Sequence, residues 1–145
     1  MTGLTHDERG YPDTTDPEAH DRLVQRLVAK VESARRAIAD YEVVNPDAEI
    51  VFVTYGAPSR TVEQVIHDRP GDSIGHLRLR VVWPFPEFAL QEFPNARVFL
   101  MPELNMGQMV REVQRHVDQP VISLPKIGGE LHTPAELVRA LEAHR

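Results

Sequence analysis

Short apolar runs alternate with helical patterns four times along this chain, and this alternation limits the possible folds more than any other feature. The first run, residues 50–53, is continuous, as is typical of a parallel strand that is covered on both faces. Further strands are predicted at residues 77–82, 97–101 and 121–124. Because a helical pattern follows each strand, we expect a mainly parallel sheet with helices on both faces.

The helices that follow the strands are predicted from apolar spacing and capping residues. One is expected at residues 106–117, and Thr133 with Pro134 is an N-cap and a first-turn proline for the last one. Inward-facing apolar side chains are expected at Val62, Val65, Ile66, Phe88, Leu90, Phe93, Met109, Val110, Val113, Leu137, Val138 and Leu141. Trp83 ends a predicted strand before two prolines, so we expect it to be at least half buried.

A longer amphipathic helix is predicted before the first strand. Asp16, Pro17 and Glu18 provide an N-cap, a first-turn proline and an acid that suits the helix dipole. One apolar stripe then continues for about seven turns through Leu23, Leu27, Val31, Ala34, Ile38 and Tyr41. It indicates a surface helix, with a coiled-coil partner as the alternative. Residues 1–15 lack such a period and are interpreted as a leader or linker, so the predicted domain is residues 16–145.

Composition excludes several classes of function. The net charge of -6 leaves no basic face for nucleic acid. Without Cys, the chain cannot hold a thiolate zinc site or an iron–sulfur cluster, so any electron-transfer centre must lie on another polypeptide. No apolar run approaches the roughly 20 residues that span a bilayer, and the N-terminal stretch does not resemble a signal peptide. We therefore expect a cytoplasmic protein without membrane contact.

Local motifs for catalysis or cofactor binding are weak. His6, Asp7 and Glu8 are consecutive and point in different directions, so a solvated loop is favoured over a metal site. Gly56 stands alone after the first strand, without the further glycines of a dinucleotide-binding turn. Ser59 and Ser123 lack the G-x-S-x-G context of a nucleophile, and Ser59 is expected to cap a helix. We predict no catalytic, cofactor-binding or metal residue.

The segment 102–108 is the most informative one, because it joins the carboxyl end of a strand to the start of a helix. In open α/β sheets this position faces ligands and partners. Asn105 as a helix cap, with Gly107 allowing close packing, is the alternative interpretation. The predicted contact residues for another subunit or domain are Glu103, Leu104, Asn105, Met106, Gly107 and Gln108.

Four motifs in order resemble one enzyme family over essentially the whole chain. They are Thr2-Gly3-Leu4-Thr5-His6-Asp7-Glu8-Arg9-Gly10-Tyr11-Pro12, Trp83-Pro84-Phe85-Pro86, Glu103-Leu104-Asn105-Met106-Gly107-Gln108 and Lys126-Ile127-Gly128-Gly129. This set is similar to the α subunit of 2-oxoacid:ferredoxin oxidoreductases, closest to the 2-oxoglutarate synthase type. The resemblance implies a transketolase C-terminal fold: a three-layer α/β/α sandwich whose five-stranded sheet includes one antiparallel strand.

The resemblance also implies a role within a larger enzyme. In such enzymes thiamine diphosphate is bound with Mg²⁺ between the α and β subunits, and it attacks the 2-oxoacid. Carbon dioxide leaves, coenzyme A takes the acyl group, and electrons pass through iron–sulfur clusters to ferredoxin. We expect this domain to fold alone, to be inactive alone, and to assemble with the β subunit and the rest of the α subunit. A self-sufficient ligand-binding or regulatory module, and a pure oligomerisation domain, are the alternatives.

Overall fold

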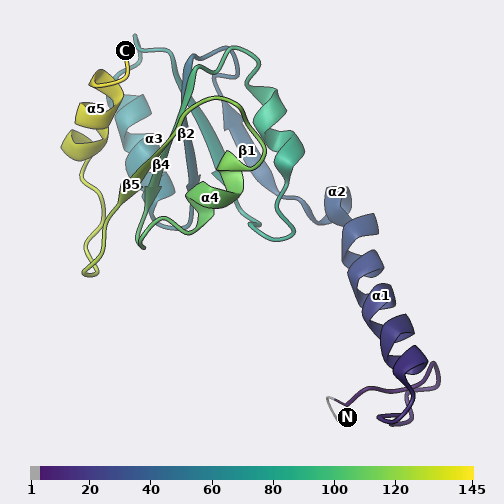
Figure 1. The fold of residues 1–145 in the computed structure, drawn as a ribbon. Helices are drawn as coiled ribbons and strands as arrows, with labels where there is room; N and C mark the ends of the chain where they lie inside the picture. Colours follow the sequence, from purple (N-terminus) through teal and green to yellow (C-terminus); the bar gives the residue numbers. More distant parts are fainter. Residues whose placement is uncertain (1–3) are drawn as a thin grey trace. The chain divides into compact units, whose positions relative to one another are not determined.

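The computed structural model describes residues 4–145, so Thr2 and Gly3 of the first motif lie outside the described residues. The chain forms two compact units, one that ends at Ile38 and one at Ala39–Arg145 (Figure 1). The predicted domain of residues 16–145 differs from this division by including the long helix, and it stays a prediction. Within residues 4–145, no helix combines the length and apolar character that crossing a membrane requires.

The first unit is built around one helix, α1 (Pro17–Ser33), followed by the short α2 (Arg35–Ile38). Asp16 caps α1 as predicted, because its carboxylate accepts the N–H of Glu18 at 2.9 Å. The preceding loop pairs His6 with Pro12, and the Thr5 hydroxyl lies 2.9 Å from Nδ1 of His20 on α1. The prediction that a helix continues to Tyr41 is wrong, because Tyr41 begins a strand.

A five-stranded sheet in the order β1-β3-β2-β4-β5 forms the centre of the second unit. The strands are β1 (Tyr41–Val44), β2 (Ile50–Tyr55), β3 (Ile74–Leu79), β4 (Val98–Glu103) and β5 (Val121–Pro125). All neighbours are parallel except β1, which is antiparallel to β3. The fold implied by the family resemblance is therefore confirmed. Periodicity alone missed β1, because Tyr41 falls in phase with the apolar stripe of α1.

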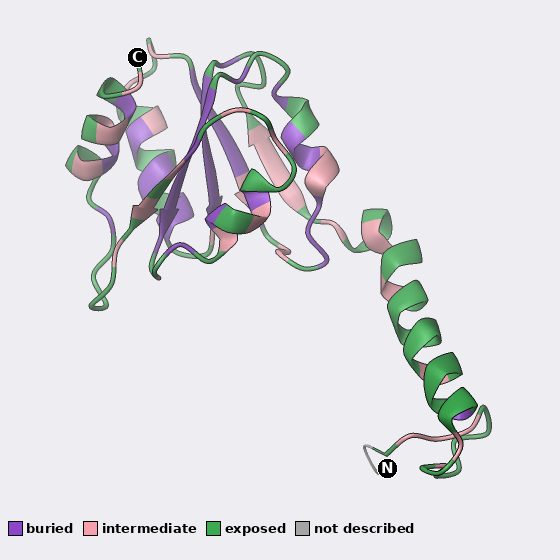
Figure 2. Ribbon diagram, in the orientation of Figure 1, coloured by how far each residue is buried: buried purple, intermediate pink, exposed green. Residues whose placement is uncertain are grey.

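Helices cover both faces of the sheet, as predicted, and make the three layers seen in Figure 1. Phe52 points to the face covered by α3 (Pro58–Asp68) and α5 (Pro134–Glu142), where it packs with Val62 and Leu137. Its neighbours Val51 and Val53 point to the opposite face, which α4 (Met109–Gln114) and the 3-10 helix η1 (Glu87–Glu92) cover. The central strands are consequently buried on both faces (Figure 2).

The strand boundaries differ from the predicted ones by up to three residues, and for two elements the hydrogen bonds give the reason. β3 ends at Leu79 rather than Val82, because the N–H groups of Arg80 and Val81 donate to the carbonyl of Asp40 and leave the ladder. The helix predicted at residues 106–117 is only α4, since side chains hold residues 104–108 in a turn. The predicted start of α5 is confirmed, because Thr133 and Glu136 form a reciprocal capping box.

The prediction that Trp83 is at least half buried is wrong, because 70% of its surface is exposed. Phe85, two residues later, occupies the core position and is 6% exposed. Its ring stacks on that of His116 with centroids 5.4 Å apart. Sequence pattern showed that this segment turns sharply, but not which of its two aromatic residues turns inward.

Replacing Gly75 with Ala is expected to lower the free energy of unfolding by about 1–3 kcal/mol. A Cβ atom at this buried position of β3 would lie 2.9 Å from Cγ2 of Val51 and 3.1 Å from the ring of Phe93. Gly71→Ala is the control, because nothing lies within 4 Å of its added Cβ. Urea unfolding of both variants measures the difference, and equal stabilities would contradict the packing argument.

Candidate functional site

A buried carboxylate organises the carboxyl end of β4. Glu103 is fully buried, and its two oxygens accept the N–H groups of Met109 at 2.9 Å and Val110 at 3.0 Å. These N–H groups belong to the first turn of α4, so Glu103 caps this helix from the strand before it. The Tyr55 hydroxyl, at the end of β2, donates to the same carboxylate at 3.0 Å. One side chain thereby joins two strands and a helix.

Asn105 extends this network into the loop. Its amide oxygen accepts the N–H groups of Gly107 at 2.8 Å and Gln108 at 3.0 Å, and its amide nitrogen donates to the Tyr55 hydroxyl at 2.8 Å. Burial raises the pKa of the Tyr55 phenol, and the adjacent Glu103 carboxylate adds to the increase. The phenol therefore stays protonated near neutral pH and can donate to Glu103 while it accepts from Asn105.

Gly107 has a reason to be glycine. Its φ of +82° is one that side chains with a Cβ rarely adopt, and an added Cβ would lie 2.8 Å from Oγ of Ser123 on β5. The close packing at Gly107 that the sequence offered as the alternative interpretation is therefore present. The predicted helix cap is not Asn105, because Asn105 accepts N–H groups of the turn before α4 and Glu103 accepts those of the first turn of α4.

The six predicted contact residues divide into two groups. Glu103 and Gly107 are buried and Asn105 is half-buried, so these three hold the loop in place. Leu104, Met106 and Gln108 point outward, with Met106 73% exposed. Met106 consequently does not fold back onto the core. The role of this loop as a subunit or interdomain contact stays a prediction.

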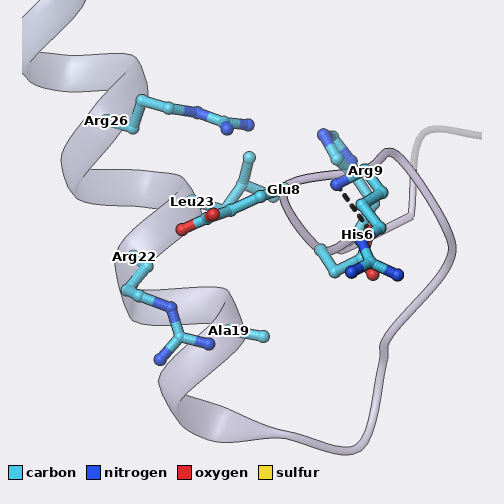
Figure 3. Close-up of a pocket in the computed structure, with 8 residues that line it drawn as sticks. His6, Glu8, Arg9, Ala19, Arg22, Leu23 and Arg26 are labelled. Carbon is cyan, nitrogen blue, oxygen red and sulfur yellow. Dashed lines mark hydrogen bonds between the residues drawn. The ribbon is translucent and has the colours of Figure 1, made fainter.

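A second polar feature lies within the first unit. A cleft of about 590 Å³ is lined by the loop that contains His6 and by the side of α1 that carries Arg22 and Arg26 (Figure 3). Asp7, the middle residue of the metal-capable triplet, is engaged within this loop, because its carboxylate accepts the N–H groups of Arg9 and Tyr11, each at 2.9 Å. In residues 4–145, no three metal-binding side chains are grouped around a common point.

Ser59 does not cap its helix, which corrects the expectation from sequence. It is fully buried inside α3, and its hydroxyl lies 2.8 Å from the Thr54 hydroxyl. The Thr54 hydroxyl is also 2.7 Å from Nε2 of His76, which is buried on β3. Burial lowers the pKa of His76 to about 4, and the positive charge of Arg78 contributes. The sequence treated His76 as one of several scattered histidines and missed this buried cluster.

Comparison with known proteins decides the family. Residues 48–137 match the family model described as pyruvate:ferredoxin oxidoreductase core domain II. The chain belongs to this family. The matched residues include β2–β5, the Glu103 network and the loop around Met106, so the site described above lies within the domain that defines the family.

Relatives extend the similarity over nearly the whole chain. It is 48% identical to 2-oxoglutarate synthase subunit KorA of Methanocaldococcus jannaschii, over 97% of this chain and 39% of that protein. Identity to KorA of Methanothermobacter marburgensis is 42%, again over 97% and 39%. Identity to ketoisovalerate oxidoreductase subunit VorB of the same organism is 28%, over 90% and 38%. The chain thus spans about two fifths of the length of these curated relatives.

A solved structure confirms the fold. The match is to 2-oxoglutarate:ferredoxin oxidoreductase from Magnetococcus marinus, which was solved with 2-oxoglutarate, coenzyme A and succinyl-CoA bound. The TM-score is 0.84 with 23% sequence identity, over 98% of this chain and 26% of that one. Because the sequence identity is only 23%, this similarity is evidence for the fold of the chain alone.

Proposed function

We propose that this chain is the C-terminal domain of the α subunit of a thiamine-diphosphate-dependent 2-oxoacid:ferredoxin oxidoreductase that acts on 2-oxoglutarate. Family membership supports the enzyme class. The substrate is supported by the relatives, since two KorA proteins of 2-oxoglutarate synthase are 48% and 42% identical and a ketoisovalerate subunit is 28% identical. The complete enzyme would work in the cytoplasm and convert the 2-oxoacid and coenzyme A to an acyl-CoA and carbon dioxide, with reduction of ferredoxin.

The role we assign to this domain is assembly. In the complete enzyme, thiamine diphosphate with Mg²⁺ supplies the decarboxylation chemistry and iron–sulfur clusters carry the electrons. We assign no residue of this chain to either group, and a chain without Cys has no thiolate to hold a cluster. Its partners would be the β subunit and the remaining part of the α subunit.

One observation carries the assembly role. Five large apolar side chains are exposed in the loops that follow β3, β4 and β5, at the edge where the parallel strands end, here called the carboxyl edge. They are Trp83 (70%), Leu104 (38%), Met106 (73%), Ile127 (64%) and Leu131 (49%). Among the described residues of the second unit, the one other large exposed apolar side chain is Val44. Such a concentration of exposed apolar surface is typical of a protein interface.

Substituting Trp83 and Met106 with Ser is expected to weaken assembly without unfolding the domain. Both side chains are mostly exposed, so the free energy of unfolding of the chain should change by no more than about 0.5 kcal/mol per substitution. When the chain is combined with the β subunit and the remaining α-subunit part from the same genome, the double variant should show lower subunit affinity. Its 2-oxoglutarate-dependent ferredoxin reduction should fall accordingly.

Val44→Ser is the matched control, because Val44 is exposed on β1 away from the carboxyl edge. It should leave assembly and turnover unchanged. The chain without its partners should show no 2-oxoglutarate oxidation. Oxidation of 2-oxoglutarate by the isolated chain would contradict the proposal that this domain assembles the enzyme and is inactive alone. Normal assembly of the Trp83 and Met106 double variant would show that the interface lies elsewhere.

A further inference from the structure

The cleft in the first unit is lined by more positive than negative charge, although the whole chain has a net charge of -6. The charged side chains that line it are Arg9, Arg22 and Arg26 against Asp7 and Glu8. In Figure 3, Arg26 on α1 and Glu8 on the preceding loop extend into the space between the helix and the loop. The proposed function assigns no role to this cleft.

The loop that forms one wall of the cleft is held in place by hydrogen bonds. The carboxylate of Asp7 accepts two backbone N–H groups of its own loop, and the N–H of Asp13 donates to the carbonyl of Thr5 at 2.8 Å. The Thr5 hydroxyl also lies 2.9 Å from Nδ1 of His20 on α1. The two walls are therefore connected before a ligand arrives, which lowers the entropy cost of binding.

The guanidinium groups that line the cleft are free or only loosely paired. Within residues 4–145, the side chains of Arg9 and Arg26 form no ion pair and no hydrogen bond. Arg22 lies 3.7 Å from Asp16 and 3.8 Å from Glu18, which is beyond hydrogen-bond distance, and its side chain is 58% exposed. Exposed pairs of this kind contribute little, so all three guanidinium groups remain available to an anion.

We propose that this cleft binds the phosphate group of a small phosphorylated organic molecule. Guanidinium groups form paired, charge-assisted hydrogen bonds with phosphate, and phosphate has enough oxygens to engage more than one of them. A carboxylate, with one charge and two oxygens, suits three guanidinium groups less well.

The size and lining of the cleft indicate that the ligand has an organic part. A volume of about 590 Å³ exceeds what one phosphate needs and lies within the range of small-molecule sites, and Ala19 and Leu23 add apolar lining. The binding requires no Mg²⁺, since no three metal-binding side chains are grouped in residues 4–145. It is thereby distinct from the binding of thiamine diphosphate in the complete enzyme.

Isothermal titration calorimetry of the intact chain, without divalent metal, tests this proposal. Pyrophosphate should bind at one site per chain more tightly than inorganic phosphate because it carries more charge, and added salt should weaken both. Phenyl phosphate should also bind more tightly than inorganic phosphate, because its ring can contact Leu23. Succinate should bind more weakly than any of these probes.

Three results would overturn the proposal. The first is no binding of pyrophosphate at millimolar concentration. The second is succinate binding as tight as that of pyrophosphate, which would show that the cleft does not select phosphate. The third is equal affinity for inorganic and phenyl phosphate, which would show that the cleft does not recognise an organic part.

Substitutions of the arginines test where the phosphate binds. Arg9→Gln and Arg26→Gln should each weaken pyrophosphate binding at least about fivefold, and Arg26→Lys should weaken it less, because it keeps the charge but loses the planar fork. Arg111→Gln is the control, because it makes the same change of charge at an exposed position of α4 in the second unit. Equal weakening by Arg26→Gln and Arg111→Gln would reveal a response to net charge alone and overturn the proposed site.

Glu8→Gln should change the affinity in the opposite direction. Within residues 4–145 the Glu8 carboxylate lines the cleft without an ion pair or hydrogen bond, so it repels a bound phosphate. Its replacement should raise the affinity for pyrophosphate by up to about fivefold. Circular dichroism and thermal unfolding should show unchanged helix content and melting temperature in every variant, because the substituted side chains are exposed. Weaker pyrophosphate binding by Glu8→Gln would overturn the proposal.

Discussion

Replacing Glu103 with Ala is expected to lower the free energy of unfolding by about 3–5 kcal/mol, the largest effect we predict for a single side chain. The carboxylate is fully buried and accepts three hydrogen bonds, from Tyr55, Met109 and Val110. Without it, three buried or half-buried donors lose their acceptor, and each unsatisfied donor costs about 1–3 kcal/mol before water or side-chain relaxation recovers part of the loss.

Glu103→Gln should give a smaller loss than Glu103→Ala. The Gln amide keeps one oxygen acceptor but turns an NH₂ group toward a donor that needs an acceptor. Glu49→Ala is the control, because Glu49 is exposed and its ion pair with Arg97 lies at the surface, where such pairs contribute less than about 1 kcal/mol. If urea unfolding gave the Glu103→Ala and Glu49→Ala chains the same stability, the capping role of Glu103 would be refuted.

Acidification is expected to destabilise the folded chain through His76 by about 3 kcal/mol in total. Burial lowers the pKa of this imidazole from 6.5 to about 4 in the folded state. In the unfolded chain it takes up a proton as the pH falls through 6.5, whereas in the folded chain it stays neutral until about pH 4. The free energy of unfolding is therefore unaffected by His76 above pH 6.5 and falls progressively between pH 6.5 and pH 4. About 2 kcal/mol of it is lost between pH 7 and 5.

The measurement is the free energy of unfolding as a function of pH, in the native chain and in two His variants. His76→Gln should remove the decrease of about 2 kcal/mol in the free energy of unfolding between pH 7 and 5, even if it lowers this free energy at every pH. His67→Gln is the control, because the His67 side chain is 84% exposed and should leave the slope unchanged. The interval above pH 5 is chosen because most carboxylates remain ionised there. An unchanged slope in His76→Gln would contradict the assignment.

The hydrogen bonds of Glu103 and Asn105 at the end of β4 stabilise the loop to which we assign the assembly role. Glu103 and Asn105 fix the turn from inside, and Leu104 and Met106 are exposed on it as a result. A binding surface on a loop gains affinity when the loop is already ordered before the partner arrives. Within the Glu-Leu-Asn-Met-Gly-Gln motif, Glu103 and Asn105 therefore hold the loop, and the contact that we propose for Leu104 and Met106 would use a loop that is already ordered.

Much of the fold was predictable from the sequence for local reasons. The continuous apolar run at residues 50–53 is typical of a strand covered on both faces, and β2 is that strand. Asp16 and Thr133 satisfy free N–H groups within their own first turns, so both helix starts followed from neighbouring residues. The fifth, antiparallel strand came from the family resemblance, and local pattern did not find it.

What only the tertiary structure decided depends on residues far apart in the chain. Glu103 caps α4 because a hydrogen bond to Tyr55, 48 positions earlier, and the burial of β4 hold its carboxylate there. Phe85 rather than Trp83 enters the core, where it joins the cluster under α4 and stacks on His116. Burial beside Thr54 lowers the pKa of His76, so that it is neutral near pH 7. Apolar periodicity and capping residues depend on interactions within one helix or strand, so the sequence predicts them. The burial of a side chain and its hydrogen-bond partners depend on which helices and strands the folded chain brings together.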